Sequence, residues 1–222
     1  VQALSGDSTI TDRNVSSVTY NSVALTKAGE SDDANFLNAE IWYLVAPTTG
    51  SNNIVVTWGG TNGARAVGGI GLSGVHQTVT IGTPAQTSGS GAAATATPAS
   101  AVGDLVVATI SSDSEGGITE SGTLRWEIQN VGADCSFGAQ TYAGASPTVA
   151  VAWTQGITGW AVVAVSFKPA AAGETITIDK WEPKLRHVSP PKPYVVPSGT
   201  IGIKNAIARA RWLQSLKVAA YC

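Results

Sequence analysis

Short runs of β-branched and aromatic residues, separated by Gly, Ser, Thr and Asn, recur throughout the first 169 residues of this chain. Such runs are typical of β-strands, because side chains branched at Cβ and aromatic rings pack well on a pleated surface. Runs that recur about every ten residues, with turn signals between them, are typical of an antiparallel β-sandwich or a barrel. We therefore expect an all-β sandwich domain over residues 1–169, with strands within 16–29, 38–47, 52–60, 64–75, 76–83, 103–112, 122–131, 135–143, 147–155 and 159–169.

Two stretches of this region carry specific turn or loop signals. Asn21-Ser22 lies between two strand-like runs, which predicts a two-residue hairpin turn. Residues 87–101 contain almost nothing but Ser, Gly, Ala and Thr. We expect this low-complexity stretch to be a long connection across one end of the sandwich.

The composition changes after Pro169. Residues 170–199 contain a short linker, a further candidate strand at 175–179 and five prolines between Pro183 and Pro197. Proline-rich segments are stiff and extended. We therefore expect residues 170–199 to be a linker followed by an extended arm.

Residues 200–222 have the apolar spacing of a short amphipathic helix. Ile203, Ile207 and Leu213 fall on one face of such a helix, whereas Trp212 and Leu216 fall on the opposite face. A helix that is apolar on two faces suits a position between neighbouring subunits better than a position on one domain.

The net charge of −2 conceals a strong asymmetry along the chain. Residues 1–173 contain five Lys or Arg and twelve Asp or Glu, whereas residues 174–222 contain eight Lys or Arg and three Asp or Glu. The net charges of these two parts are therefore −7 and +5. An acidic body with a basic tail favours contacts between the body of one copy and the tail of another, or between the tail and a separate acidic partner.

The sequence contains only weak matches to cofactor-binding and catalytic motifs. Residues 69–74 match the GxGxxG pattern of dinucleotide sites, but that pattern binds a cofactor only where a helix follows it. The residues after it predict a strand, so we expect sheet packing and no cofactor. His76 and His187 are the only histidines. A hydrolase would need His76 in a pocket with a carboxylate and a nucleophile such as Ser73. We expect a protein that is not an enzyme, with no catalytic residue.

Acidic residues gather in two turn-like stretches. Asp113, Glu115 and Glu120 lie close in sequence, as do Asp32 and Asp33. Carboxylates in one loop can bind Ca²⁺, but solvated acidic turns are more common. We expect no metal site.

Most of the seven tryptophans lie in predicted strands, and we expect most of them to be core residues. Trp126, between Arg125 and Glu127, is the one expected to face outward. An outward cluster of aromatic rings would favour a second hypothesis, a glycan-binding or adhesive surface module. The cations of the tail are spread over 49 residues, so we do not expect nucleic acid as a partner. The sequence contains no run of 18 apolar residues, so we expect no membrane-spanning helix.

The segments "VTYNSVALTKAG", "AEIWYLVAPTTGSNNIVVTW", "GDLVVATIS" and "GWAVVAVSFKP" resemble a β-sandwich family of tailed phages and environmental bacteria. Its members read "VTYNGVALT" at the hairpin, where this chain has Ser22 in place of the Gly. The resemblance covers about residues 15–169 and implies a jelly-roll-like module of a virion or a cell surface. It implies further strand sequence before Val1, so we expect a chain that is processed or truncated there.

The asymmetry of charge and the resemblance together predict a structural protein of a phage-like particle, either a capsid decoration or a tail or surface component. We expect it in the virion or at an extracellular surface. It would bind other copies or other virion proteins through residues 183–222, with surface glycan as the alternative ligand. The expected assembly interface consists of Tyr194, Ile203, Ile207, Arg209, Arg211, Trp212, Leu213 and Leu216.

Overall fold

Every regular element that the structure describes is a β-strand. The computed structural model describes residues 1–6, 14–34, 36–60, 63–131 and 135–184 of the 222-residue chain, and for 180–184 it describes the backbone alone. Within these ranges there is no α-helix, and all paired strands are antiparallel. The predicted all-β fold is therefore confirmed. The predicted C-terminal helix at 200–222 lies outside the described residues.

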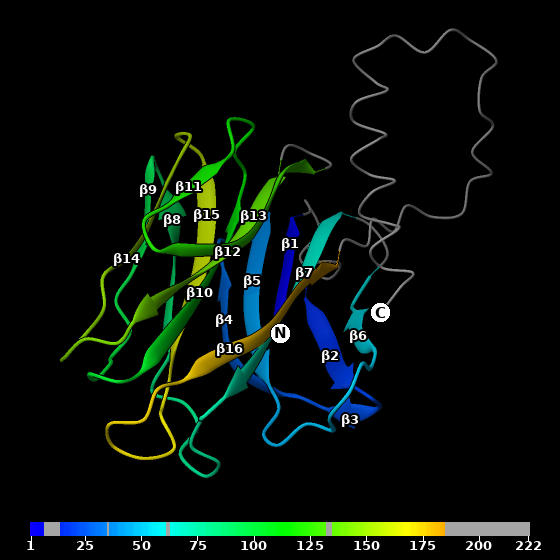
Figure 1. The fold of residues 1–222 in the computed structure, drawn as a ribbon. Coiled ribbons are helices and arrows are strands. Elements are labelled where there is room, and N and C mark those ends of the chain that lie inside the picture. Colours follow the sequence, from blue (N-terminus) through cyan, green and yellow to red (C-terminus); the bar gives the residue numbers. More distant parts are fainter. Residues whose placement is uncertain (7–13, 35, 61–62, 132–134, 185–222) are drawn as a thin grey trace, which may run out of the picture. The chain divides into compact units, whose positions relative to one another are not determined.

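The chain divides into two units, 1–48 with 52–190 and 49–51 with 191–222, and the strands all lie in the first unit. Ten of its strands form two five-stranded sheets (Figure 1). The β5 sheet has the order β16 (Thr177–Lys184), β7 (Ala64–Ser73), β1 (Gln2–Gly6), β5 (Leu37–Tyr43) and β4 (Thr26–Asp32). The β10 sheet has the order β12 (Thr123–Val131), β13 (Cys135–Ala143), β10 (Leu105–Ser112), β15 (Gly159–Phe167) and β8 (Ala85–Ser90).

Two small sheets cover the five-stranded sheets on either side (Figure 1). The β2 sheet contains β3 (Val23–Ala24), β2 (Val15–Tyr20) and β6 (Ile54–Trp58). The β14 sheet contains β11 (Ile118–Glu120), β14 (Val151–Gln155) and β9 (Ala93–Ala96). Three hydrophobic cores fill the space between these layers.

The large core joins the two five-stranded sheets. It contains Leu4 and Leu37 from the β5 sheet and Phe137 and Val163 from the β10 sheet. The second core lies on the other face of the β10 sheet, where Val162 meets residues of the β14 sheet such as Trp153. Because β10 and β15 are covered on both faces, they are buried almost continuously and do not alternate between buried and exposed residues.

The third core joins the β2 sheet to the outer face of the β5 sheet. Ala3 of β1 and Trp42 of β5 pack there against Val15 and Val18 of β2. The β5 sheet is therefore also covered on both faces.

The hairpin turn at Asn21-Ser22 is confirmed. Tyr20 pairs with Val23, and the φ angles of Asn21 and Ser22 are 49° and 64°. Two successive residues with positive φ make a type I′ turn, whose twist matches that of the flanking strands.

Two local predictions were wrong. Residues 87–101 do not form one long connection, because β8 extends to Ser90 and β9 follows at Ala93–Ala96. Small residues form strands here because β8 pairs with β15 and β9 pairs with β14. Residues 76–83 are not a strand. They form a loop with an isolated bridge from Ile81 to Phe167, and the His76 side chain accepts two backbone N–H groups in its first turn.

The ends of the described chain lie in one sheet. β1, which carried no strand prediction, is the central strand of the β5 sheet and pairs with both β5 and β7. β16 pairs with β7 over Thr177–Lys184, so the chain leaves the described region from an edge strand of this sheet.

Candidate functional site

The eight residues expected at the assembly interface, from Tyr194 to Leu216, lie outside the described residues. The other candidates can be located. His76 and Ser73 do not meet as a catalytic pair. Nδ1 of His76 accepts N–H bonds from Thr78 and Val79 at 3.1 and 3.0 Å, whereas the hydroxyl of Ser73 donates to Asp179 Oδ1 at 2.9 Å. Each side chain therefore stabilises its own surroundings.

The glycine-rich stretch 69–74 forms the second half of β7. It pairs with β16 from Gly69 to Ser73, and the loop that begins at Val75 follows it. A strand followed by a loop does not supply the helix N-terminus that holds a pyrophosphate. The glycines here allow close pairing of the two strands.

The acidic turns do not meet as a metal site. Within the described parts of the chain, no three His, Cys, Asp or Glu side chains gather in a group that could hold a metal ion. In the same parts of the chain, no helix has the length and apolar character needed to cross a membrane.

In the described part of the chain, four tryptophans are buried: Trp42, Trp126, Trp153 and Trp160. The expectation that most strand tryptophans are core residues is confirmed, but the outward orientation of Trp126 was wrong. Trp126 is 2% exposed, and its Nε1 donates to Gln2 Oε1 of β1 at 3.3 Å. Glycine at position 68 leaves space for its indole ring between β12 and β7. Trp58 is half-buried, and the Arg65 guanidinium lies 5.0 Å from the centre of its ring.

A buried carboxylate lies between the β2 and β5 sheets. The side chain of Glu40 has no exposed surface. Its Oε2 accepts a hydrogen bond from Trp42 Nε1 at 2.7 Å and forms an ion pair with Lys27 Nζ at 3.1 Å. Oε1 accepts from Asn38 at 3.0 Å and from the Val15 N–H of β2 at 3.1 Å. This network links the two sheets through one carboxylate. Burial raises the pKa of Glu40, and this effect outweighs its hydrogen bonds and the nearby Lys27.

A second carboxylate organises the end of the strands near His76. Asp104 is buried, and its Oδ2 accepts from Lys168 Nζ at 2.8 Å, Ser166 Oγ at 2.6 Å and the Ala101 N–H at 2.9 Å. Burial raises the pKa of Asp104, but these donors outweigh burial and hold it below its ordinary value. Both Glu40 and Asp104 therefore serve the fold.

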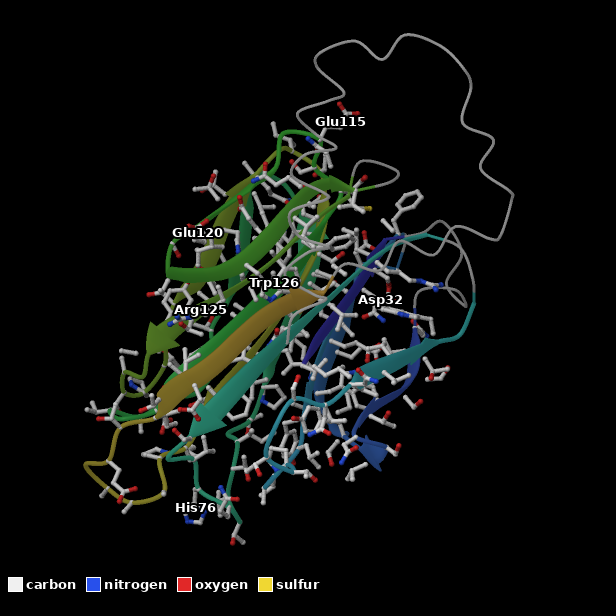
Figure 2. All side chains as sticks on the ribbon, turned by 45° about the vertical axis from the view of Figure 1, so that its right-hand side comes forward. Asp32, His76, Glu115, Glu120, Arg125 and Trp126 are labelled. Carbon is white, nitrogen blue, oxygen red and sulfur yellow. The ribbon has the colours of Figure 1, made fainter. Side chains whose placement is uncertain are left out.

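The candidate site that remains is at the opposite end of the strands. Figure 2 shows Glu115 there and His76 at the other end. Among the described residues, those of four loops lie together at this end: β4–β5, β8–β9, β10–β11 and β14–β15. We call this group of loops the loop end. The Gly156 N–H of β14–β15 donates to Ser114 Oγ of β10–β11 at 3.1 Å. The Gly91 N–H of β8–β9 donates to Thr158 O of β14–β15 at 3.0 Å.

Buried polar side chains hold these loops in place. Ser112 donates to Gln155 Oε1, and Gln155 Nε2 donates to Gly91 O at 2.9 Å. The hydroxyl of Ser136, in β13, donates to Ser114 O at 2.9 Å. Hydrogen-bonded side chains with little exposure keep one conformation, so the loop end is preorganised.

The β4–β5 loop also belongs to the loop end. A side chain at Gly159 would meet Oδ2 of Asp33 at 2.9 Å, so this loop lies against the start of β15. Oδ1 of Asp33 accepts the N–H groups of Phe36 and Leu37, both at 2.8 Å. Phe36 is thereby held at the surface while Leu37 enters the core.

Apolar and acidic side chains share the loop end. Phe36 is 46% exposed, and Ile157 is 87% exposed. Four carboxylates stand in the same loops or at their borders: Asp32, Asp33, Asp113 and Glu115. This arrangement has the chemistry of a surface that binds a basic and partly apolar partner.

The carboxylates of the loop end are evident in the sequence, but its apolar residues are not. Phe36 was missed because it directly precedes a strand and resembles a core residue. Ile157 could have been found from the sequence. It lies between Gly156 and Thr158 in a predicted turn, and a large aliphatic side chain in a turn is expected to be exposed. The comparisons with known proteins add no further residue, because no protein-family model, no curated protein and no solved structure matches this chain.

Proposed function

We propose that this protein is a structural subunit of a phage-like particle, a capsid decoration or a tail or surface component, and that it assembles through the basic residues 183–222. It works without catalysis, in the virion or at an extracellular surface. Its partners are further copies or other virion proteins. One observation carries the proposal: the described Lys and Arg side chains are bonded within the unit, whereas several of its carboxylates are exposed.

The cations described in the unit are engaged within it. Lys27 pairs with Glu30 and Glu40, Lys168 pairs with Asp104, and Arg125 donates to Thr141 Oγ1 at 2.8 Å. Arg65 is buried and donates to Gly60 O at 2.7 Å.

Carboxylates, in contrast, are distributed over the surface. Those with substantial exposure include Glu115, Glu127, Glu174 and Asp179. The outer surface of the unit is therefore acidic. Residues 185–222 contain six Lys or Arg and no Asp or Glu, so they complement this surface in charge. Complementary charge steers association and fixes its register.

We also infer that the two five-stranded sheets form the sandwich that the resemblance implies. The mixed origin of the large core supports this, because Leu4, Phe137 and Val163 come from both sheets. The jelly-roll-like connectivity stays a prediction. A unit covered in four layers suits a particle component, since its buried β10 and β15 make it hard to unfold locally.

The test is the mass of the full chain in solution, measured by light scattering over a range of concentration and salt. We expect assemblies larger than a monomer that dissociate as salt is raised, because salt screens exposed charges. The variant Arg209→Glu/Arg211→Glu should remain monomeric, and the matched variant Arg209→Lys/Arg211→Lys should assemble. A full chain that stays monomeric in low salt at its solubility limit would contradict self-assembly through this segment.

A separate measurement addresses location. An antibody raised against the full chain should label phage-like particles from producing cells in electron micrographs. Labelling of the cell surface with no labelled particles would instead favour the adhesive alternative.

A further inference from the structure

We propose that the loop end is the surface that receives residues 185–222 of a second copy. This inference rests on the proposed function and deepens it, because it names the docking surface and the occupant. The occupant is a segment of this chain that carries six Lys or Arg and no Asp or Glu.

Two exposed apolar side chains, Phe36 and Ile157, stand at the loop end. They are among the few large apolar side chains with high exposure, at 46% and 87%. They lie on neighbouring loops, because Asp33 of the β4–β5 loop lies against Gly159 at the end of the β14–β15 loop. Residues 185–222 carry matching apolar side chains, including Ile203, Trp212 and Leu213. Large apolar side chains at the centre of an interface provide most of its affinity.

Acidic residues lie in the β4–β5 loop, which carries Phe36, and in the adjoining β10–β11 loop. Asp33 caps the loop that carries Phe36, and the Asp113 N–H bonds Gly159 O at 3.1 Å. Glu115 is exposed on the adjoining β10–β11 loop. Exposed apolar side chains beside the exposed carboxylate of Glu115 fit a segment that alternates apolar residues with Lys and Arg, as residues 203–213 do.

The loop end is also ready to bind. Ser112, Ser114 and Ser136 are buried, and Gln155 is 8% exposed. Their hydrogen bonds fix the loops before any partner arrives, so docking orders only the incoming segment. Less ordering on binding leaves more of the contact energy as affinity.

The opposite end of the strands provides an internal comparison. Val79 and Val102 are exposed there, at 59% and 84%. Asp104 at that end is buried and paired with Lys168, and Glu174 is the exposed carboxylate of the β15–β16 loop. That end offers apolar side chains with two exposed carboxylates, Glu174 and Asp179, and Asp179 already accepts a hydrogen bond from Ser73 Oγ. This end therefore supplies a matched control surface.

The experiment uses the full chain and two triple variants. Phe36→Ser/Glu115→Lys/Ile157→Ser changes the loop end, and Val79→Ser/Val102→Ser/Glu174→Lys makes the same kinds of change at the control end. Self-association is measured by sedimentation equilibrium in low salt, and folding is checked by circular dichroism. We expect the loop-end variant to associate at least about tenfold more weakly than the wild type, because an interface centre is lost. The control variant should stay within about twofold, since surface changes away from an interface have little effect.

A second measurement needs no substitution. Equal amounts of ¹⁵N-labelled and unlabelled full chain are mixed and treated with a zero-length carbodiimide cross-linker. We expect mixed-isotope cross-links from Lys192, Lys204 or Lys217 to Glu115 or to the other carboxylates of the loop end, Asp32, Asp33 and Asp113. This result would support the proposal even if the loop-end variant failed to fold.

The outcomes separate this inference from the proposed function. A wild-type chain that does not associate contradicts self-assembly, and with it both this inference and the self-assembling form of the proposed function. A wild-type chain that associates equally with both triple variants, and whose mixed-isotope cross-links lie elsewhere, overturns the loop end alone. A monomeric chain that binds glycans through Phe36 and Ile157 would overturn both.

Discussion

The indole ring of Trp126 occupies the space that a side chain at position 68 would need, so Gly68 of β7 and Trp126 of β12 form a matched pair across the two five-stranded sheets. The ring is buried, and its Nε1 bonds Gln2 of the central strand β1. This contact brings the edge of one sheet against the body of the other. It also explains why a tryptophan flanked by Arg125 and Glu127 faces inward.

Gly68→Ala should destabilise the fold by about 1–3 kcal/mol, because an added methyl group meets a packed ring that has little room to move. The measurement is denaturant unfolding followed by tryptophan fluorescence. Gly116→Ala is the control, since the nearest atom to its new methyl group is Ser114 Oγ at 3.9 Å. Equal stabilities of the two variants would show that Trp126 is not seated against Gly68.

Ser22→Gly should stabilise the protein by about 0.5–1 kcal/mol. A left-handed backbone costs a non-glycine residue about 1–2 kcal/mol, and the greater chain entropy of glycine offsets part of the gain. Ser22 has a φ of 64° in the type I′ turn, a backbone conformation that favours glycine. Ser88→Gly, at an exposed position in β8, should have the opposite sign. A loss of stability in Ser22→Gly would argue against this turn type.

Asp104→Asn should cost about 2 kcal/mol at neutral pH, because it removes a buried carboxylate that accepts charge-assisted hydrogen bonds from Lys168 and Ser166. The pKa of Asp104 is held below its ordinary 3.8, so the folded state binds the proton less well than the unfolded state. Its contribution to stability is therefore present above pH 3.8 and disappears as the pH falls through the lower, folded-state pKa. Unfolding midpoints in urea should differ strongly at neutral pH and converge in acid. Asp179→Asn, an exposed position, is the matched control.

Glu40 should give the opposite dependence on pH. Its pKa is raised above 4.5 by burial, so the folded state binds the proton more tightly than the unfolded state. The contribution of this group to stability is greatest below pH 4.5 and decreases as the pH rises through the raised, folded-state pKa. In Glu40→Gln this decrease should be absent. The check is the slope of the unfolding free energy against pH above 4.5, and equal slopes in the two proteins would contradict the prediction.

Much of the secondary structure could be predicted from the sequence, because strand propensity and turn chemistry act locally. The runs at 103–112 and 159–169 correspond to β10 and β15, and Asn21-Ser22 is the predicted turn. The exceptions are segments without such residues. Ala93–Ala96 is a strand only because β14 pairs with it, and small residues give no local signal of that pairing.

The candidate site was predictable only in part, for the same reason. Glu115 and Asp33 were evident as acidic turn residues. That their loops meet depends on the contacts of Ser114 with Gly156 and of Asp33 with Gly159, which join segments more than 40 residues apart in sequence. No local pattern records such a meeting.

The sequence by itself determined that this chain forms antiparallel strands, because Val, Ile, Thr and aromatic residues favour the extended backbone at each position independently. It also determined the asymmetry of charge between residues 1–173 and 174–222. Only the tertiary structure decided which strands are covered on both faces, that Trp126 faces the core and that Phe36 and Ile157 face solvent. Whether a residue is buried depends on which sheets pack against each other. That packing is determined by many contacts between residues that are distant in sequence, so no single segment specifies it.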